Sequence, residues 1–374
     1  FHIVDYNLSI RLYRLTNRQN QTQIVEFKQE EIGSVDKFRN KLESFGNYLW
    51  LARMEQLLKL KLYLYDNTTT AYYVSKPGWQ SYGFYAFSNG VVYQDEWYEI
   101  DEYGIVAIPG KGNFYIPALS CINKSKKTRR NSFERNFVYL RRGGISLFDY
   151  SRLLFRVYGD NSMIPILFYL CSLFRDIIVA ETQNYPILNL FGLTGSGKPA
   201  LGKFLMAFFV TSYDPANLKN GTIPSIAETV AQSSNALVQI DEYKNSIEYD
   251  KVEFLKGLWD GTGRNRMNMD KDKKKEMTAV DAGIMLTGQE MPKADIALFS
   301  RVIFTAFSKS NFNDMEKQLF NDLKAVEKDG LTHITNEIIS HRHDFVELYR
   351  KNFDDLLNDP ARPLVNRATQ GTYP

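Results

Sequence analysis

The chain has 374 residues, of which 44% are hydrophobic, 24% charged and 14% aromatic, and its formal net charge is +3. It is too apolar for a disordered protein and too long for one small core, so we expect two or three domains of roughly 100–200 residues each. The same composition excludes collagen-like and coiled-coil proteins.

Cysteine usage and hydropathy restrict the compartment. Cys121 and Cys171 match no CxxC spacing, which argues against a disulfide framework and against a zinc site, and with it a zinc-ribbon primase module. We therefore expect a protein of the reducing cytoplasm. The longest apolar stretch, 163–174, falls short of the roughly 20 residues that a spanning helix needs, so no membrane partner is expected.

The first part of the chain, residues 1–145, is rich in Tyr, Phe, Val and Ile. Residues 34–45 predict a helix, because Ser34 offers an N-cap and apolar residues follow at helical spacing. Short alternating runs predict strands of a mixed sheet at 10–13, 71–74 and 91–93. We therefore expect a β-rich α+β domain that ends near residue 145.

From residue 146 the pattern changes to helices that alternate with short, nearly unbroken apolar strands. This pattern is typical of a parallel sheet covered by helices on both faces. The strands are expected at 187–191, 236–240, 283–287 and 302–307. The prediction is an α/β core over 146–312, followed over 313–374 by an incomplete helical lid, with a helix at 314–327 and one or two helices at 332–350.

A glycine-rich turn lies between the first of these strands and the helix after it. Such a turn lets backbone N–H groups approach a polyphosphate, while the helix N-terminus adds partial positive charge and Lys198 reaches the outer phosphates. We expect ATP to bind at Gly192, Thr194, Gly195, Ser196, Gly197 and Lys198.

Pro199 departs from this motif. A phosphate loop normally continues with Ser or Thr, whose hydroxyl binds Mg²⁺, and proline has neither a hydroxyl nor an N–H. Proline is well tolerated in the first turn of a helix, so we expect the fold to survive and Mg²⁺-dependent hydrolysis to be reduced.

The second strand, 236–240, ends in the paired acids Asp241 and Glu242. In a nucleotide enzyme the first carboxylate would hold the Mg²⁺ shell and the second would polarise the attacking water.

The third strand ends in polar groups, and an arginine directly precedes the fourth. Thr287 or Gln289 is placed to contact the γ-phosphate or the lytic water, unless the segment is an ordinary turn. Arg301 is a candidate finger that reaches the γ-phosphate of a neighbouring subunit, and a surface salt bridge is the alternative.

Two basic clusters stand out from the nearly neutral total. The first cluster runs over 124–142, where the polar stretch 123–136 is predicted to be a linker or exposed loop. Between the acidic pair and the third strand, residues 261–280 predict two short strands joined by a lysine-rich tip, which would follow a phosphate backbone without reading bases, or else form a solvated loop. The DNA-contacting residues expected there are Lys271, Lys273, Lys274 and Lys275.

The order of phosphate loop (Walker A), acidic pair (Walker B), lysine-tipped hairpin, polar third strand and Ser300-Arg301 resembles the AAA+ helicases of the minichromosome-maintenance and superfamily 3 type. More narrowly, 222–231 and 257–264 are similar to a helicase-like family, once catalogued as a domain of unknown function, of bacterial mobile elements, phages and plasmids. This resemblance implies a P-loop AAA+ fold, ATP and Mg²⁺ as cofactors, single-stranded DNA as partner, a homo-oligomeric ring, normally a hexamer, and association with a primase or another replication protein.

These observations favour an ATP-dependent DNA helicase or replication-initiation motor. An ATP-gated switch that grips DNA but hydrolyses slowly is the second hypothesis, because Pro199 weakens the metal shell. A small-molecule P-loop kinase is the third, and it would need neither the lysine hairpin nor Arg301.

Overall fold

The computed structural model describes residues 1–4, 9–124, 132–140, 144–267, 275–308 and 313–358. The chain divides into two compact units, Phe1–Arg135 and Asn136–Pro374, and each is described by itself. The sequence pattern put the boundary near residue 145, whereas the division follows Arg135 because Asn136 and Phe137 pack within the second unit. Phe137 is fully buried with its ring 6.0 Å from that of Phe209, and the Asn136 carbonyl accepts a hydrogen bond of 2.9 Å from the Thr211 N–H.

A six-stranded mixed sheet forms the centre of the first unit, in the order β3-β2-β1-β4-β10-β9. Its strands are β1 (His2–Val4), β2 (Ser9–Thr16), β3 (Thr22–Lys28), β4 (Thr70–Tyr73), β9 (Ile105–Ile108) and β10 (Gly112–Tyr115). An antiparallel meander follows β4, made of β5 (Gly78–Gln80), β6 (Phe84–Phe87), β7 (Gly90–Tyr93) and β8 (Glu96–Glu99). The expected strands at 10–13 and 91–93 are confirmed as parts of β2 and β7, and the one expected at 71–74 is confirmed as β4, which ends at Tyr73.

The first two helices of this unit share a hydrophobic cluster with β3. The predicted helix is confirmed as α1 (Val35–Glu43), whose N-cap Ser34 accepts a hydrogen bond from the Lys37 N–H, and whose buried Phe38 packs against Phe27 of β3. The other short elements are η1 (Gln29–Ile32), α2 (Met54–Asp66), η2 (Pro117–Leu119), α3 (Cys121–Lys124) and α4 (Ser132–Asn136).

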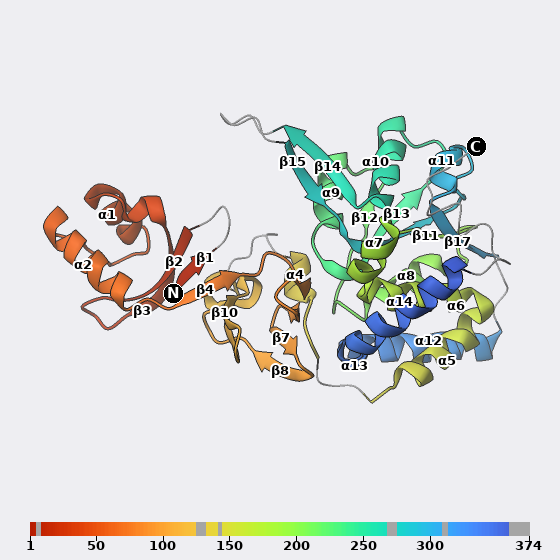
Figure 1. Ribbon diagram of the computed structural model, residues 1–374, viewed down its shortest axis with the longest axis horizontal. Coiled ribbons are helices and arrows are strands. Elements are labelled where there is room, and N and C mark those ends of the chain that lie inside the picture. The colour runs from red at the N-terminus through yellow and green to blue at the C-terminus, as the bar shows by residue number, and fades with distance from the viewer. Residues whose placement is uncertain (5–8, 125–131, 141–143, 268–274, 309–312, 359–374) are drawn as a thin grey trace. The chain divides into compact units, whose positions relative to one another are not determined.

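The second unit contains a parallel sheet in the order β17-β11-β16-β13-β12 (Figure 1). Its strands are β11 (Ile187–Gly192), β12 (Ala216–Asn217), β13 (Ser234–Tyr243), β16 (Asp281–Gly288) and β17 (Val302–Phe307). The four apolar runs are confirmed as strands, and they are nearly unbroken because helices cover both faces of the sheet. The unit therefore has the α/β architecture of a P-loop NTPase.

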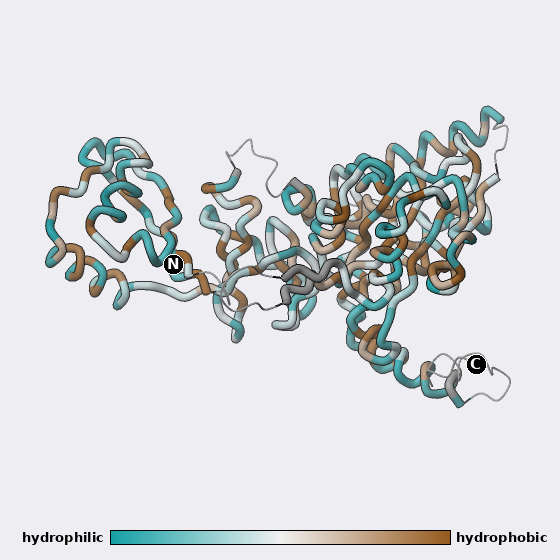
Figure 2. The backbone as a smooth tube through the Cα atoms, turned by 90° about the horizontal axis from the view of Figure 1, so that it is seen from above, coloured by the Kyte–Doolittle hydropathy of each residue, from teal (hydrophilic) through white to brown (hydrophobic). Residues whose placement is uncertain are grey.

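Two helical layers enclose this sheet, and hydrophobic segments run through the interior between them (Figure 2). On one face Ile240 and Leu286 share a core with Val230 and Leu255 from the covering helices. This first layer consists of α9 (Ile223–Val230), α10 (Tyr249–Trp259) and α11 (Ile296–Phe299). The second layer contains α5 (Leu147–Tyr158), η3 (Gly159–Ser162), α6 (Met163–Leu173), α7 (Arg175–Thr182) and α8 (Lys198–Met206).

The C-terminal helices, α12 (Asp314–Asp329), α13 (Thr332–Ser340) and α14 (Arg342–Asn358), pack onto the second layer within the same compact unit. The Thr335 hydroxyl donates a hydrogen bond of 2.6 Å to the Phe208 carbonyl, and the rings of Phe345 and Phe174 stack at 4.1 Å. The segment expected to be one or two helices is two, because the chain turns at His341.

Among the described residues, no single helix is both long and apolar enough to cross a membrane. Leu147–Leu173 and Arg175–Thr182 meet that requirement only when taken together, and they bend by 85° where they meet.

Candidate nucleotide-binding site

The glycine-rich turn connects the end of β11 to the start of α8, as the sequence predicts. A side chain at Gly192 would place its Cβ 2.1 Å from the carbonyl oxygen of Phe307, so this position must be glycine for β11 and β17 to pair. Gly197 has a φ of +85° and caps α8, a conformation that glycine adopts without strain. The loop therefore delivers its amides to the N-terminus of α8, which is the usual arrangement for phosphate binding.

Lys198 is held inside this loop. Its Nζ donates hydrogen bonds to the Gly192 carbonyl (2.7 Å), the Leu193 carbonyl (2.8 Å) and the Ser196 hydroxyl (3.0 Å). Burial lowers the pKa of the Lys198 ammonium, and the nearby Asp241 carboxylate opposes that shift. The ammonium and the first acid of the pair thus act on the same small volume.

Pro199 lies in the first turn of α8 without breaking it. The first hydrogen bond of the helix runs from the Leu201 N–H to the Gly197 carbonyl at 3.0 Å. An amide at position 199 would have no acceptor within the helix, so proline costs no helical hydrogen bond there. It still removes one donor and the hydroxyl from the edge of the phosphate loop.

The paired acids interrupt β13. Ile240 pairs with Leu286 and Tyr243 with Gly288, so β13 has one more residue than β16 between these pairs, and this extra residue makes a β-bulge at Asp241 and Glu242. Glu242 takes a φ of +67°, in the left-handed region that residues with a side chain rarely occupy. Bulges and strained residues of this kind re-aim side chains at functional sites.

Thr287 fixes the first acid. The fully buried Thr287 hydroxyl donates a hydrogen bond of 2.5 Å to Oδ1 of Asp241, and the Glu242 N–H donates to the same oxygen at 2.8 Å. The sequence offered Thr287 or Gln289 as a contact for the γ-phosphate or the lytic water, and in the structure the Thr287 hydroxyl bonds to the Asp241 carboxylate.

Gln289 is the polar group after β16 that reaches the phosphate loop. Its Nε2 donates a hydrogen bond of 3.1 Å to the Thr194 hydroxyl. Of the two residues that the sequence offered at this strand end, Gln289 is the one that contacts the loop.

Two residues of the site lie outside the motifs. Gln239 donates from Nε2 to the Thr287 hydroxyl at 3.3 Å, and its amide packs where a Cβ on Gly202 would lie. The Tyr158 hydroxyl donates to the Gly197 carbonyl at 3.2 Å. The sequence does mark Gln239, because it is a polar residue between the apolar Val238 and Ile240 of a buried strand. No local pattern marks Tyr158.

Arg301 lies at the amino ends of the parallel strands, whereas the phosphate loop lies at their carboxyl ends. Its carbonyl accepts from the N–H of Ile187 at 3.1 Å, at the start of β11, whereas the phosphate loop follows the end of that strand. The length of β11 separates the two by roughly 16 Å. The Arg301 Nη1 donates to the Ala297 carbonyl at 2.6 Å, so within its own chain Arg301 does not join the phosphate loop.

The predicted hairpin forms. β14 (Thr262–Met267) pairs antiparallel with β15 (Lys275–Ala279), and the pair extends away from the body of the second unit (Figure 1). Lys275 begins β15, while Lys271, Lys273 and Lys274 lie outside the described residues, as does much of the stretch 124–142.

The phosphate loop and the nearby Asp241 fit a nucleoside triphosphate with magnesium. In the part of the chain that the structure describes, no three His, Cys, Asp or Glu side chains cluster to hold a metal ion. Mg²⁺ needs no such cage, because it keeps several waters and is bound by one or two carboxylates together with phosphate oxygens. Asp241 supplies one carboxylate beside the phosphate loop.

Comparison with known proteins supports the fold. No family model matches the chain, and neither does any curated protein sequence. In structure the chain is similar to the active helicase Cch of SCCmec type IV, with a TM-score of 0.54, 12% identity, and coverage of 99% of this chain and 66% of that one. The chain thus spans about two thirds of that helicase, with which it shares a helicase-type fold.

Two further solved structures match at lower TM-scores. The C-terminal region of NrS-1 has a TM-score of 0.39 and 10% identity, with coverage of 100% of this chain and 78% of that one. The JCV helicase has a TM-score of 0.32 and 14% identity, with coverage of 61% and 67%.

Proposed function

We propose that this chain is an ATP-dependent DNA helicase, a replication motor of a mobile element or phage that acts in the cytoplasm as a hexameric ring and moves along single-stranded DNA. One observation carries the proposal: the phosphate loop with Lys198, the bulged acids Asp241 and Glu242, and Gln289 lie together at the carboxyl ends of neighbouring parallel strands. Ligands of open α/β sheets bind at that edge.

The residues divide the chemistry among them. The loop amides and Lys198 would hold the phosphates of ATP, and Asp241, oriented by Thr287, would hold Mg²⁺, which neutralises phosphate charge when bound. Glu242 would accept a proton from the attacking water, and Gln289 would sense the outer phosphate from its place beside Thr194.

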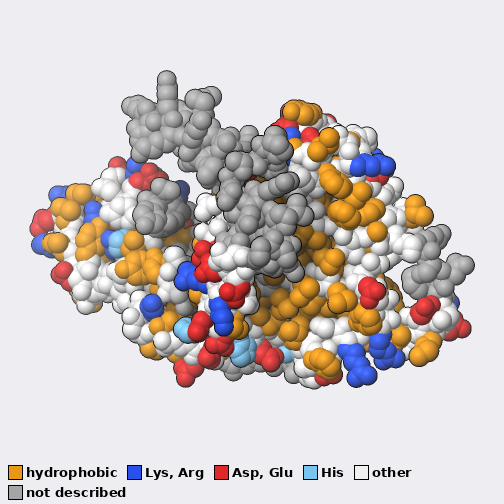
Figure 3. All heavy atoms as spheres, turned by 45° about the vertical axis from the view of Figure 1, so that its right-hand side comes forward, with side chains coloured by type: hydrophobic (Ala, Val, Ile, Leu, Met, Phe, Trp, Pro, Cys, Tyr) orange, Lys and Arg blue, Asp and Glu red, His pale blue; other side chains and the backbone are white. Residues whose placement is uncertain are grey.

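The ring is supported by the surface around Arg301. β17 is an edge strand of the parallel sheet, and large apolar side chains are exposed on it and on α11. They are Ile296, which is 85% exposed, and Phe299, Ile303 and Phe304. Figure 3 shows apolar side chains gathered on this side of the second unit. An apolar patch next to a guanidinium that has no ion-pair partner among the described residues suits contact with a second copy, whose phosphate loop Arg301 would reach.

The direct test of the motor is electron microscopy of the protein with a nonhydrolysable ATP analogue, together with a strand-displacement assay. Rings with ATP-dependent displacement are the expected result. Single particles that do not bind DNA would favour the small-molecule kinase and contradict the proposed motor.

Changing Lys271, Lys273 and Lys274 together to alanine is expected to weaken binding of single-stranded DNA. Three lost phosphate contacts should reduce the slope of log affinity against log salt by about 2. The matched control replaces three exposed lysines elsewhere, Lys37, Lys59 and Lys317, and should keep both affinity and slope. Equal affinity of the hairpin variant and the native chain at every salt concentration would remove the hairpin from the DNA path.

Pro199 favours a second candidate, the switch that binds ATP and DNA but hydrolyses slowly. Replacing Pro199 with serine is expected to raise ATP turnover by tenfold or more, because it restores both the amide and the Mg²⁺-binding hydroxyl. Pro199→Ala restores the amide alone and should give a smaller gain. If the native chain and Pro199→Ser had equal turnover, the proline would not limit hydrolysis. That result would favour the motor over the switch.

A further inference from the structure

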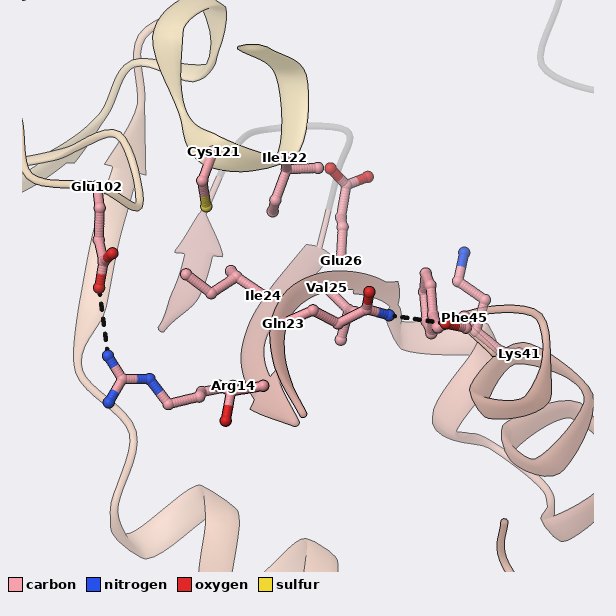
Figure 4. A pocket seen from close by; sticks show the side chains of 11 residues that line it. Arg14, Gln23, Ile24, Val25, Glu26, Lys41, Phe45, Glu102, Cys121 and Ile122 are labelled. Atoms are coloured by element: carbon pink, nitrogen blue, oxygen red, sulfur yellow. Dashed lines mark hydrogen bonds and ion pairs between the residues drawn. The ribbon is translucent and has the colours of Figure 1, made fainter. Parts of the chain in front are cut away.

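A cavity of about 580 Å³ in the first unit follows the free edge of β3 (Figure 4). Among the strands that the structure describes, β3 is the last of the six-stranded sheet and pairs with β2 alone. The consecutive residues 22–26 of this strand all line the cavity. Because successive side chains of a strand point to opposite faces, a cavity lined by consecutive residues lies along the edge of the strand and not over one face.

Two walls rise on either side of this edge. Figure 4 shows Lys41 of α1 and Phe45, just after that helix, on one side of β3, and Cys121 and Ile122 of α3 on the other. The cavity thus has the form of a groove with a strand at its base, and its volume is within the range of about 300–1,000 Å³ that ligand sites occupy.

The backbone of β3 offers hydrogen bonds to this groove. The Asn17 N–H donates to the Gln21 carbonyl at 3.1 Å, and this bond fixes the alternation along the β2–β3 pair. Gln23 and Val25 consequently bond to β2, while Ile24 and Glu26 direct their N–H and C=O groups into the groove. In the described part of the chain, no other group makes a hydrogen bond to the backbone of Ile24 or Glu26.

In the described part of the first unit, one carboxylate of the groove has no ion-pair partner. Arg14 pairs with Glu102 at 3.2 Å, and Lys41 pairs with Glu31 at 3.0 Å. Glu26, which is half-buried, has no ion-pair partner among residues 1–4, 9–124 and 132–135. A basic side chain flanked by apolar ones would complement Glu26 together with Phe45 and Ile122.

We propose that the free edge of β3 binds an extended peptide segment of a partner protein as an additional strand, with a lysine or arginine of the peptide opposite Glu26. Backbone hydrogen bonds to Ile24 and Glu26 give the affinity, and the two walls select alternate side chains of the peptide. This activity is separate from the nucleotide site and does not depend on the proposed motor.

The test uses a phage-displayed library of random seven-residue peptides, selected against the full chain. The expected peptides alternate apolar residues and carry one lysine or arginine. Glu26→Lys should weaken these peptides at least tenfold and select acidic ones instead, whereas the exposed Glu43→Lys, outside the groove, should change nothing. Failure to enrich any peptide, or equal selection by native chain and Glu26→Lys, would overturn the proposal.

Amide hydrogen exchange then locates the selected peptide. Protection should increase at Ile24 and Glu26 and not at Gln23 and Val25, which already bond to β2. Alkylation of Cys121 should slow while that of Cys171 is unchanged. Protection elsewhere would refute the site, and protection of Ile24 and Glu26 that grows with the concentration of the chain alone would assign the edge to a second copy and not to a partner peptide.

Discussion

Replacing Arg301 with alanine is expected to lower ATP turnover by roughly a thousandfold, because arginine fingers contribute about 10³–10⁵ to phosphoryl transfer. ATP affinity should change little, since Arg301 lies at the far edge of its own sheet from the phosphate loop. Steady-state turnover and nucleotide binding, measured on assembled protein, separate the two effects. Arg301→Lys is the matched control, and it should recover only part of the loss because an ammonium lacks the planar fork of a guanidinium.

Mixing variants tests whether Arg301 acts across an interface. Chains carrying Arg301→Ala and chains carrying Glu242→Gln should each be inactive alone. In mixed assemblies some interfaces combine an intact Glu242 from one copy with an intact Arg301 from another, so activity should return. Unaltered turnover of Arg301→Ala would assign this arginine to the protein surface, and lost turnover without recovery on mixing would place its action within one chain.

Glu242→Gln is the second large effect. It is expected to lower turnover by about 10²–10⁴, the usual contribution of a general base, while ATP binding remains. The amide has the shape of the carboxylate and leaves the bonds around Asp241 in place, so the fold should persist. Glu228→Gln, an exposed glutamate on α9, is the control and should be neutral. If Glu242→Gln kept the native turnover, another residue would have to accept the proton.

The fold of the second unit could largely be predicted from the sequence. A parallel sheet covered on both faces demands apolar strands, and the four runs that became β11, β13, β16 and β17 stand out for that reason. The glycine-rich turn could also be predicted, because its glycines stand out in the sequence. The structure gives the reason at Gly192, where the close approach of β11 to β17 leaves no room for a side chain.

Contacts between distant segments could not be predicted in this way. Tyr158 reaches the phosphate loop from α5, and Thr287 turns its hydroxyl to Asp241 across neighbouring strands. Neither contact leaves a periodic or local pattern. The sequence predicts C-terminal helices from their amphipathic spacing, but it does not show which surface they cover. In the structure they pack against Phe174 and Phe208.

The left-handed backbone at Glu242 has a consequence for engineering. Glycine and asparagine are the residues that this conformation suits, so a redesign guided by thermal stability alone would choose one of them at position 242. Either choice would relax the bulge and delete the carboxylate proposed to accept the proton. Variants selected in this way are expected to be more thermostable but to hydrolyse ATP more slowly.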